Sequence, residues 1–97
     1  MESITVPELK GWEKNAKKFL LLDVREEWEH AAGNIGGVNI PLGELLSRKE
    51  EVDKDEAVVV YCEKGIRSAI AIQRLEAYGF HHLINLTGGM AAWKKNA

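Results

Sequence analysis

Several features that commit a chain to a particular environment are rare or missing in this sequence. Its 97 residues include one cysteine, so an internal disulfide is impossible. Its longest apolar runs, FLLLDV and AVVVYC, have the length of strands and not the ~20 residues of a membrane-spanning helix. The N-terminal stretch MESITVPELKGW lacks the basic start and apolar core of a signal peptide. We therefore expect a cytoplasmic protein in which Cys62 stays a thiol.

An excess of charge of one sign is also missing. Thirteen Lys and Arg residues stand against fifteen Asp and Glu residues, which gives a formal net charge of -2. The basic residues form no cluster of four or more, so we expect no binding to nucleic acid or to an anionic membrane. A small molecule or another protein is the expected partner.

The histidines and tryptophans carry no pattern that indicates a ligand. No second cysteine or acidic cluster stands at metal-ligand spacing from a histidine, so we expect no metal and no cofactor, and we expect solvated loop histidines. No basic stripe accompanies the tryptophans, which we expect to be core or partly buried packing residues. These residues are His30, His81, His82, Trp12, Trp28 and Trp93.

Strand and helix patterns alternate along the chain. Residues 19–24 and 57–62 are continuous apolar runs, typical of parallel strands covered on both faces, and residues 82–86 are a shorter strand candidate. Helices are expected after a capping box at residues 5–8, after Pro41, from residue 67 to about 78, and at residues 90–95. The alternation predicts a single α/β domain, residues 1–97, with a small, open, mostly parallel five-stranded sheet flanked by helices on both faces.

Cys62 stands where an apolar run stops and the loop sequence CEKGIR begins. In open α/β sheets, ligands bind beyond the carboxyl ends of the strands. Gly65 can adopt the positive φ that a tight loop requires, and loop amides, the following helix N-terminus and the charges of Lys64 and Arg67 would all favour a thiolate. Glu63 opposes them, so we expect its side chain to point away from the sulfur. The alternative, a small buried hydrophobe that ends a strand, requires neither the glycine nor the cations.

Four segments then resemble the rhodanese-like domain, a family of sulfurtransferases. They are LLDVREEWE (21–29), NIPLGEL (39–45), VVVYCEKGIRSA (58–69) and LTGGMAAW (86–93), in the order in which the family has them. The resemblance implies an enzyme of the thiosulfate sulfurtransferase type. Cys62 would accept sulfane sulfur from thiosulfate or a protein persulfide, become a persulfide itself, and pass the sulfur to cyanide, a thiol or a protein.

The resemblance also assigns the residues around Cys62. Lys64 and Arg67 would hold an anionic donor, within a substrate-binding loop formed by Glu63, Lys64, Gly65, Ile66, Arg67 and Ser68. Asp23 and Arg25 match the family's first motif and would support the loop through charge-assisted hydrogen bonds. A structural ion pair or a solvated arginine is an equal alternative for Arg25, and Asp23 is expected to accept backbone N–H groups.

One segment departs from the common pattern of the family. Many members have Gly-His-Ile-x-Gly-Ala, where this chain reads GNIGGV (33–38), with Asn34 in place of the histidine and one residue fewer before Asn39. This form resembles the rhodanese domains attached to enzymes that adenylate sulfur-carrier proteins. It favours a persulfide carrier that serves a protein partner.

Two other classes of function remain open. Cysteine-dependent phosphatases and arsenate reductases also hold a thiolate in a strand-loop-helix cradle, but five residues separate their cysteine and arginine, whereas four separate Cys62 and Arg67. A non-catalytic interaction module of the same fold would most simply have lost the cysteine. A module that only relays persulfide between proteins would have the same sequence features as an enzyme.

Overall fold

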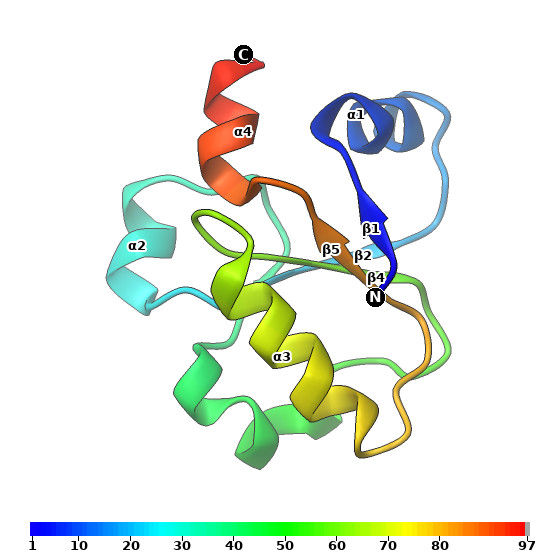
Figure 1. Ribbon diagram of the computed structural model, residues 1–97, viewed down its shortest axis with the longest axis vertical. Helices are drawn as coiled ribbons and strands as arrows, with labels where there is room; N and C mark the ends of the chain where they lie inside the picture. Colours follow the sequence, from blue (N-terminus) through cyan, green and yellow to red (C-terminus); the bar gives the residue numbers. More distant parts are fainter. Residues whose placement is uncertain (97) are drawn as a thin grey trace.

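Five short parallel strands form one open sheet in the computed structural model, which describes residues 1–96 (Figure 1). The strand order is β1-β5-β4-β2-β3. The bounds are β1 Ser3–Ile4, β2 Leu20–Asp23, β3 Val38–Asn39, β4 Val58–Tyr61 and β5 Leu83–Leu86. The expected α/β fold is confirmed, and every strand pair is parallel, where the sequence predicted a mostly parallel sheet.

The central strand β4 is buried along its whole length because structure covers both of its faces. Side chains alternate across a strand, so Val58, Val60 and Cys62 pack in one hydrophobic core while Val59 and Tyr61 pack in the other. A continuous apolar run is what such a strand requires. β2 and β5 flank β4 in parallel register, with Asp23 opposite Tyr61 at the carboxyl end of the sheet.

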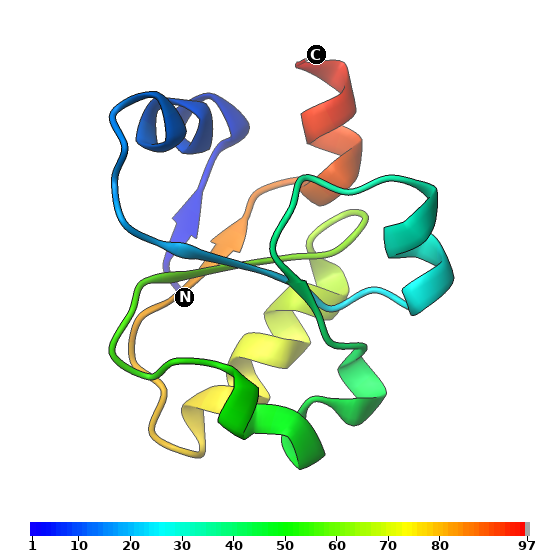
Figure 2. The same ribbon diagram turned by 180° about the vertical axis from the view of Figure 1, so that it is seen from behind.

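Helices cover the two faces of the sheet (Figures 1 and 2). Helices α1 (Val6–Lys14) and α4 (Gly89–Lys95) lie on one face. Helix α3 (Ile66–Glu76) lies on the other, together with two 3-10 helices, η1 (Leu42–Glu44) and η2 (Leu46–Glu51). Helix α2 (Glu27–Ala32) follows β2 and lies beside the loop between β4 and α3. The carboxyl edge of the sheet is therefore ringed by helix ends and loops.

Local sequence signals account for the two longest helices. The capping box at the start of α1 is present: Glu8 N–H donates to Thr5 Oγ1 at 3.3 Å, and Thr5 N–H donates to Glu8 Oε1 at 2.9 Å. In α3 the buried positions recur at helical spacing, which lays one apolar stripe on the sheet. Those positions are Ser68, Ala71, Ile72 and Leu75.

The single helix expected after Pro41 is wrong. The segment forms the short helices η1 and η2, and Arg48 has non-helical dihedral angles, φ -119° and ψ 17°. Gly43 favours no regular helix, and 3-10 turns bring the buried side chains of Leu45 and Val52 into the core. The strand expected from residue 82 begins one residue later.

The expectation for the tryptophans is also wrong at one position. Trp12 and Trp93 pack against the core on the α1 and α4 side, but Trp28 on α2 is 73% exposed. Within residues 1–96, no helix is long and apolar enough to cross a bilayer.

Candidate active site

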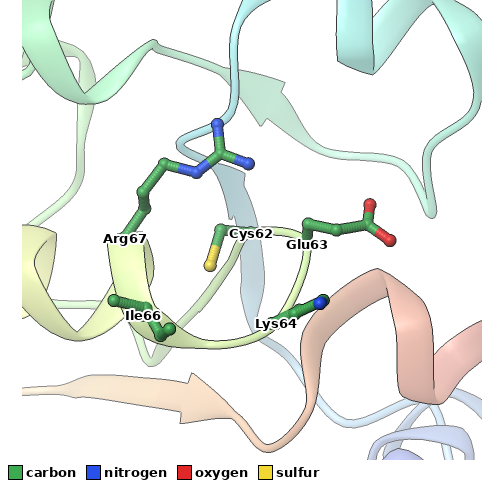
Figure 3. A pocket seen from close by; sticks show the side chains of 5 residues that line it. All are labelled: Cys62, Glu63, Lys64, Ile66 and Arg67. Carbon is green, nitrogen blue, oxygen red and sulfur yellow. The ribbon is translucent and has the colours of Figure 1, made fainter.

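Cys62 follows the last residue of β4, and the loop to α3 curls around its sulfur (Figure 3). Gly65 has φ 98° and ψ 0°, a left-handed conformation that lets the chain turn directly into α3 at Ile66. The side chain of Cys62 is buried, but it contributes to the floor of an open cleft of about 370 Å³. The cleft is lined by Cys62, Glu63, Lys64, Ile66 and Arg67.

Backbone amides of this loop and of the first turn of α3 point at the sulfur. The N–H groups of Gly65 and Ser68 donate to Cys62 Sγ at 3.1 and 3.3 Å, and Ser68 Oγ lies 3.4 Å from the same atom. Burial raises the pKa of the Cys62 thiol, whereas hydrogen bonds from the Ser68 hydroxyl and from loop N–H groups lower it by more. The net pKa lies below that of an ordinary thiol, so the site favours a thiolate.

The start of α4 explains why the loop amides are free to face the sulfur. Met90 N–H donates to the carbonyl of Cys62 at 2.9 Å, and Ala91 N–H donates to the carbonyl of Glu63 at 3.0 Å. These bonds hold the two loop carbonyls on the α4 side, away from the sulfur. These bonds require the start of α4 to lie close against the loop. Gly89 permits this approach, because a Cβ at that position would lie 2.3 Å from the Cys62 carbonyl oxygen.

A polar network below the sulfur includes a residue that sequence reasoning missed. Asn85 on β5 donates through Nδ2 to the Gly65 carbonyl at 3.1 Å, which orients its amide, and its Oδ1 accepts the Ser68 hydroxyl at 2.6 Å. Because Ser68 has one hydroxyl proton, its oxygen accepts the S–H of the neutral Cys62 thiol. When the thiol ionises, the hydroxyl can turn from Asn85 to the sulfur. The available signal was a polar residue inside the apolar strand LINL.

Two charged residues at the loop, Glu63 and Arg67, pair with charged residues of neighbouring elements. The Arg67 guanidinium donates to both carboxylate oxygens of Glu29 on α2, at 2.6 and 2.9 Å. This fork holds the pKa of Glu29 at about 2. Glu63 points away from the sulfur (Figure 3) and forms ion pairs with Arg25 at 3.7 Å and Lys94 at 3.8 Å. Sequence reasoning assigned no role to Glu29, although this residue ends the LLDVREEWE segment.

Asp23 and Arg25 form a buried ion pair beside the loop. Arg25 Nε and Nη2 donate to the Asp23 carboxylate at 2.8 to 3.1 Å, and the backbone N–H of Arg25 donates to Asp23 Oδ1 at 3.0 Å. Arg25 also donates to the Gly33 carbonyl at 2.7 Å. This arrangement matches the interpretation of a structural ion pair, and the contact of Arg25 with Glu63 links the pair to the loop.

His30 lies on α2 and belongs to the same cluster, so the expectation of a solvated loop histidine is wrong at this position. Its Nδ1 lies 2.8 Å from Asp23 Oδ2, and its side chain is 23% exposed. Burial raises the pKa of Asp23, but the hydrogen bonds from Arg25 and His30 lower it by more, so the carboxylate stays ionised. His81 and His82 are exposed, as expected.

The GNIGGV segment follows α2 and contacts Tyr61 at the end of β4. Asn34 Nδ2 donates to the His30 carbonyl at 2.9 Å, while its Oδ1 accepts the Gly36 N–H at 2.8 Å. The buried Tyr61 hydroxyl donates to the Gly36 carbonyl at 2.9 Å. Asn34 therefore ends α2 and shapes the following turn, and its side chain has no hydrogen bond to the Cys62 loop among the described residues.

Comparison with known proteins assigns the chain to a family. The family model described as "Rhodanese-like domain" matches residues 5–96, so the chain belongs to the rhodanese-like domain family, as its four segments indicated. The putative sulfurtransferase YtwF of Bacillus subtilis is 35% identical over 95 residues, which cover 97% of this chain and 91% of that protein. The thiosulfate sulfurtransferase GlpE of Coxiella burnetii is 31% identical over 91 residues, covering 92% and 85%. These relatives support a role in sulfur transfer.

Two further similarities concern the domain context and the fold. The probable adenylyltransferase/sulfurtransferase MoeZ of Mycobacterium tuberculosis is 34% identical over 96 residues, but this chain spans only 24% of its length. The solution structure of the rhodanese-like domain of Alr3790 from Anabaena has a TM-score of 0.91 and 28% identity, covering 100% of this chain and 76% of that one. The fold of the present chain is therefore that of the family.

The arrangement can perform nucleophilic chemistry at sulfur. It presents a thiol of lowered pKa at the floor of an open cleft, with hydrogen-bond donors already oriented toward negative charge on sulfur. Among residues 1–96, no group of three His, Cys, Asp or Glu side chains is placed to hold a metal ion.

Proposed function

We propose that this chain is a sulfurtransferase in which Cys62 carries the transferred sulfur as a persulfide. The observation that supports this most directly is the convergence of the Gly65 and Ser68 N–H groups on Cys62 Sγ. Neutral donors fixed in this way stabilise negative charge on the thiolate and on a persulfide formed from it. The relatives named as sulfurtransferases support the same reaction class.

The reaction has two displacement steps at sulfur. In the first, the Cys62 thiolate attacks the outer sulfur of the donor, the S–S bond of the donor breaks, and the electron pair leaves on sulfite or on a thiolate. In the second, the acceptor attacks the outer sulfur of the Cys62 persulfide and releases the Cys62 thiolate. The donor is thiosulfate or a persulfide, and the acceptor is cyanide, a thiol or a protein. A reducing cytosol would keep Cys62 available for each cycle.

A protein partner is part of the proposal. The chain resembles a domain of MoeZ, whose name joins an adenylyltransferase to a sulfurtransferase. Cys62 lines an open cleft, which a group carried on another protein could enter. We propose such a protein as a donor or an acceptor of the sulfur.

Intact mass spectrometry tests the proposed function. Incubation with thiosulfate or with cysteine persulfide should add about 32 Da, and cyanide or dithiothreitol should remove it again. Cys62→Ser, which keeps a small polar side chain at the site, should gain nothing. A mass gain that persists in Cys62→Ser, or no gain with either donor, would remove Cys62 as the sulfur carrier.

A further inference from the structure

Arg67 was expected, together with Lys64, to hold an anionic donor, yet two of the five N–H donors of its guanidinium are directed elsewhere. Both of its terminal nitrogens donate to the Glu29 carboxylate in a fork, at 2.6 and 2.9 Å. Such a bidentate pair satisfies the face of the guanidinium that would otherwise bind an anion. The Glu29 side chain is 14% exposed, so water screens this pair only in part.

Glu29 is held in place from its own helix as well. Its Oε1 accepts the backbone N–H of Glu26 at 3.0 Å, which completes the capping box at the start of α2. The carboxylate is therefore fixed between the helix cap and Arg67, and it presents a negative charge beside the cleft that contains Cys62. An anionic donor that used Arg67 would have to displace or approach this charge.

The other charged residues at the cleft supply little in place of Arg67 for binding an anion. Glu63 adds a second carboxylate at the cleft and is paired with Arg25 and Lys94. Of the two cations that line the cleft, Lys64 is the one that makes no ion pair within residues 1–96. Ile66 is 70% exposed and contributes apolar surface to the lining of the cleft. The cleft thus offers one unpaired cation and apolar surface.

We infer that Glu29 determines donor specificity, by occupying Arg67 and so favouring organic persulfides over the thiosulfate dianion. This inference rests on the proposed sulfur transfer. With thiosulfate, the dianion and the Cys62 thiolate bring three negative charges together before sulfite leaves. With a persulfide, the Cys62 thiolate attacks the outer sulfur, the S–S bond breaks, and RS⁻ leaves. One negative charge is present when the persulfide is protonated, R–S–SH, and two are present when it is ionised, so both forms bring less negative charge together than thiosulfate does.

The test is Glu29→Gln, which keeps the length of the side chain and an oxygen for the Glu26 N–H but loses the charge that occupies Arg67. Loading of Cys62 is followed by quenched intact mass at varied concentrations of thiosulfate or of cysteine persulfide, whose ammonium and carboxylate charges cancel. We expect the thiosulfate concentration for half-maximal loading rate to fall about tenfold, the effect of one released charged hydrogen-bonding group. The same quantity for cysteine persulfide should change less than about twofold.

Control variants locate the cause. Glu27→Gln removes an exposed carboxylate from the same turn of α2 and should leave the ratio of the two donors unchanged. The double variant Glu29→Gln/Arg67→Gln should lose the gain for thiosulfate. Glu29→Ala removes the carboxylate without an amide and should shift the ratio in the same direction, and circular dichroism verifies the fold of each variant.

Each outcome has a distinct meaning. An unchanged donor ratio in a folded Glu29→Gln protein overturns the inference, as does an equal gain in Glu27→Gln or a gain that survives without Arg67. If neither donor loads wild-type Cys62, the proposed sulfurtransferase function itself fails. A gain confined to thiosulfate and dependent on Arg67 supports the role of Glu29.

Discussion

Replacing Ser68 by alanine tests how the site stabilises the thiolate. In the neutral protein the Ser68 hydroxyl donates to Asn85 Oδ1 at 2.6 Å, while its oxygen lies 3.4 Å from Cys62 Sγ. When the Cys62 thiol ionises, the Ser68 hydroxyl can turn and donate its hydrogen bond to the sulfur in place of Asn85. Ser68→Ala removes this contact and leaves the backbone N–H groups of residues 65 and 68 in place.

The size of the effect follows from the competition between the two acceptors. A hydrogen bond to a charged group contributes about 1.5–3 kcal/mol, and a neutral one about 0.5–1.5 kcal/mol. Because the hydroxyl gives up Asn85 to reach the thiolate, its net contribution is about 1–1.5 kcal/mol. At about 1.4 kcal/mol per pKa unit, the pKa of Cys62 should rise by about 1 unit in Ser68→Ala.

The rate of alkylation by iodoacetamide as a function of pH gives the pKa of Cys62 directly. In the wild type, the pKa obtained from this profile should be lower than the pKa of the same cysteine in the unfolded chain, because the folded site lowers it. Ser47→Ala is a matched control, since Ser47 is exposed and donates to the Glu44 carbonyl. An unchanged pKa in Ser68→Ala would refute any role of the hydroxyl. A rise of about 2 units or more would show that the hydroxyl does not compete between Asn85 and the sulfur.

Two further variants probe the support of the loop. Gly89→Ala should lower the free energy of unfolding by roughly 2–4 kcal/mol in denaturant titrations, because its Cβ would lie 2.3 Å from the Cys62 carbonyl oxygen at φ 57°. Gly43→Ala, with open space around the added Cβ, should be tolerated, and equal stability of the two variants would contradict the close packing of α4. Asp23→Asn should cost roughly 3–5 kcal/mol at pH 7, because it removes the buried carboxylate that pairs with Arg25 and leaves only the longer contact of Arg25 with Glu63 at 3.7 Å. The pKa of Asp23 is lowered in the folded protein, so its contribution to the free energy of unfolding is present above pH ~3.9 and is lost as pH falls through the folded pKa. In that acidic range, the melting temperature of Asp23→Asn should depend less on pH than that of the wild type. The exposed control Asp55→Asn should behave like the wild type.

Local and periodic signals allowed most of the fold to be predicted. The apolar runs marked β2 and β4 because both lie inside the sheet, and the helical spacing of buried residues marked α3. The two-residue strands β1 and β3 carry too few residues for any periodicity to be visible. The segment after Pro41 has the composition of a helix, and its 3-10 geometry depends on how Leu45 and Val52 reach the core.

The residues of the candidate site also differ in how far the sequence could predict them. Cys62, Gly65 and Ser68 are neighbours in sequence, so a short motif could identify the loop. Glu29 and Asn85 reach it from α2 and β5, 38 and 17 residues from their partners Arg67 and Ser68. Such contacts depend on the order of strands in the sheet, which a single sequence does not contain. Both residues change the chemistry expected from the motif, because one occupies the arginine and the other competes for the serine hydroxyl.

The site separates the stabilisation of the thiolate from the pairing of charges. The contacts to Cys62 Sγ come from neutral groups, the N–H groups of Gly65 and Ser68 and the Ser68 hydroxyl, and α4 keeps the loop carbonyls away from the sulfur. The cations nearby mostly face carboxylates and fix the loop in place. Fixed neutral dipoles at such short distances are little screened by salt, whereas the attraction of an anion to an exposed lysine is screened strongly. Activation of Cys62 should therefore persist at high ionic strength, and any dependence of the reaction on salt should arise when a charged donor approaches Lys64.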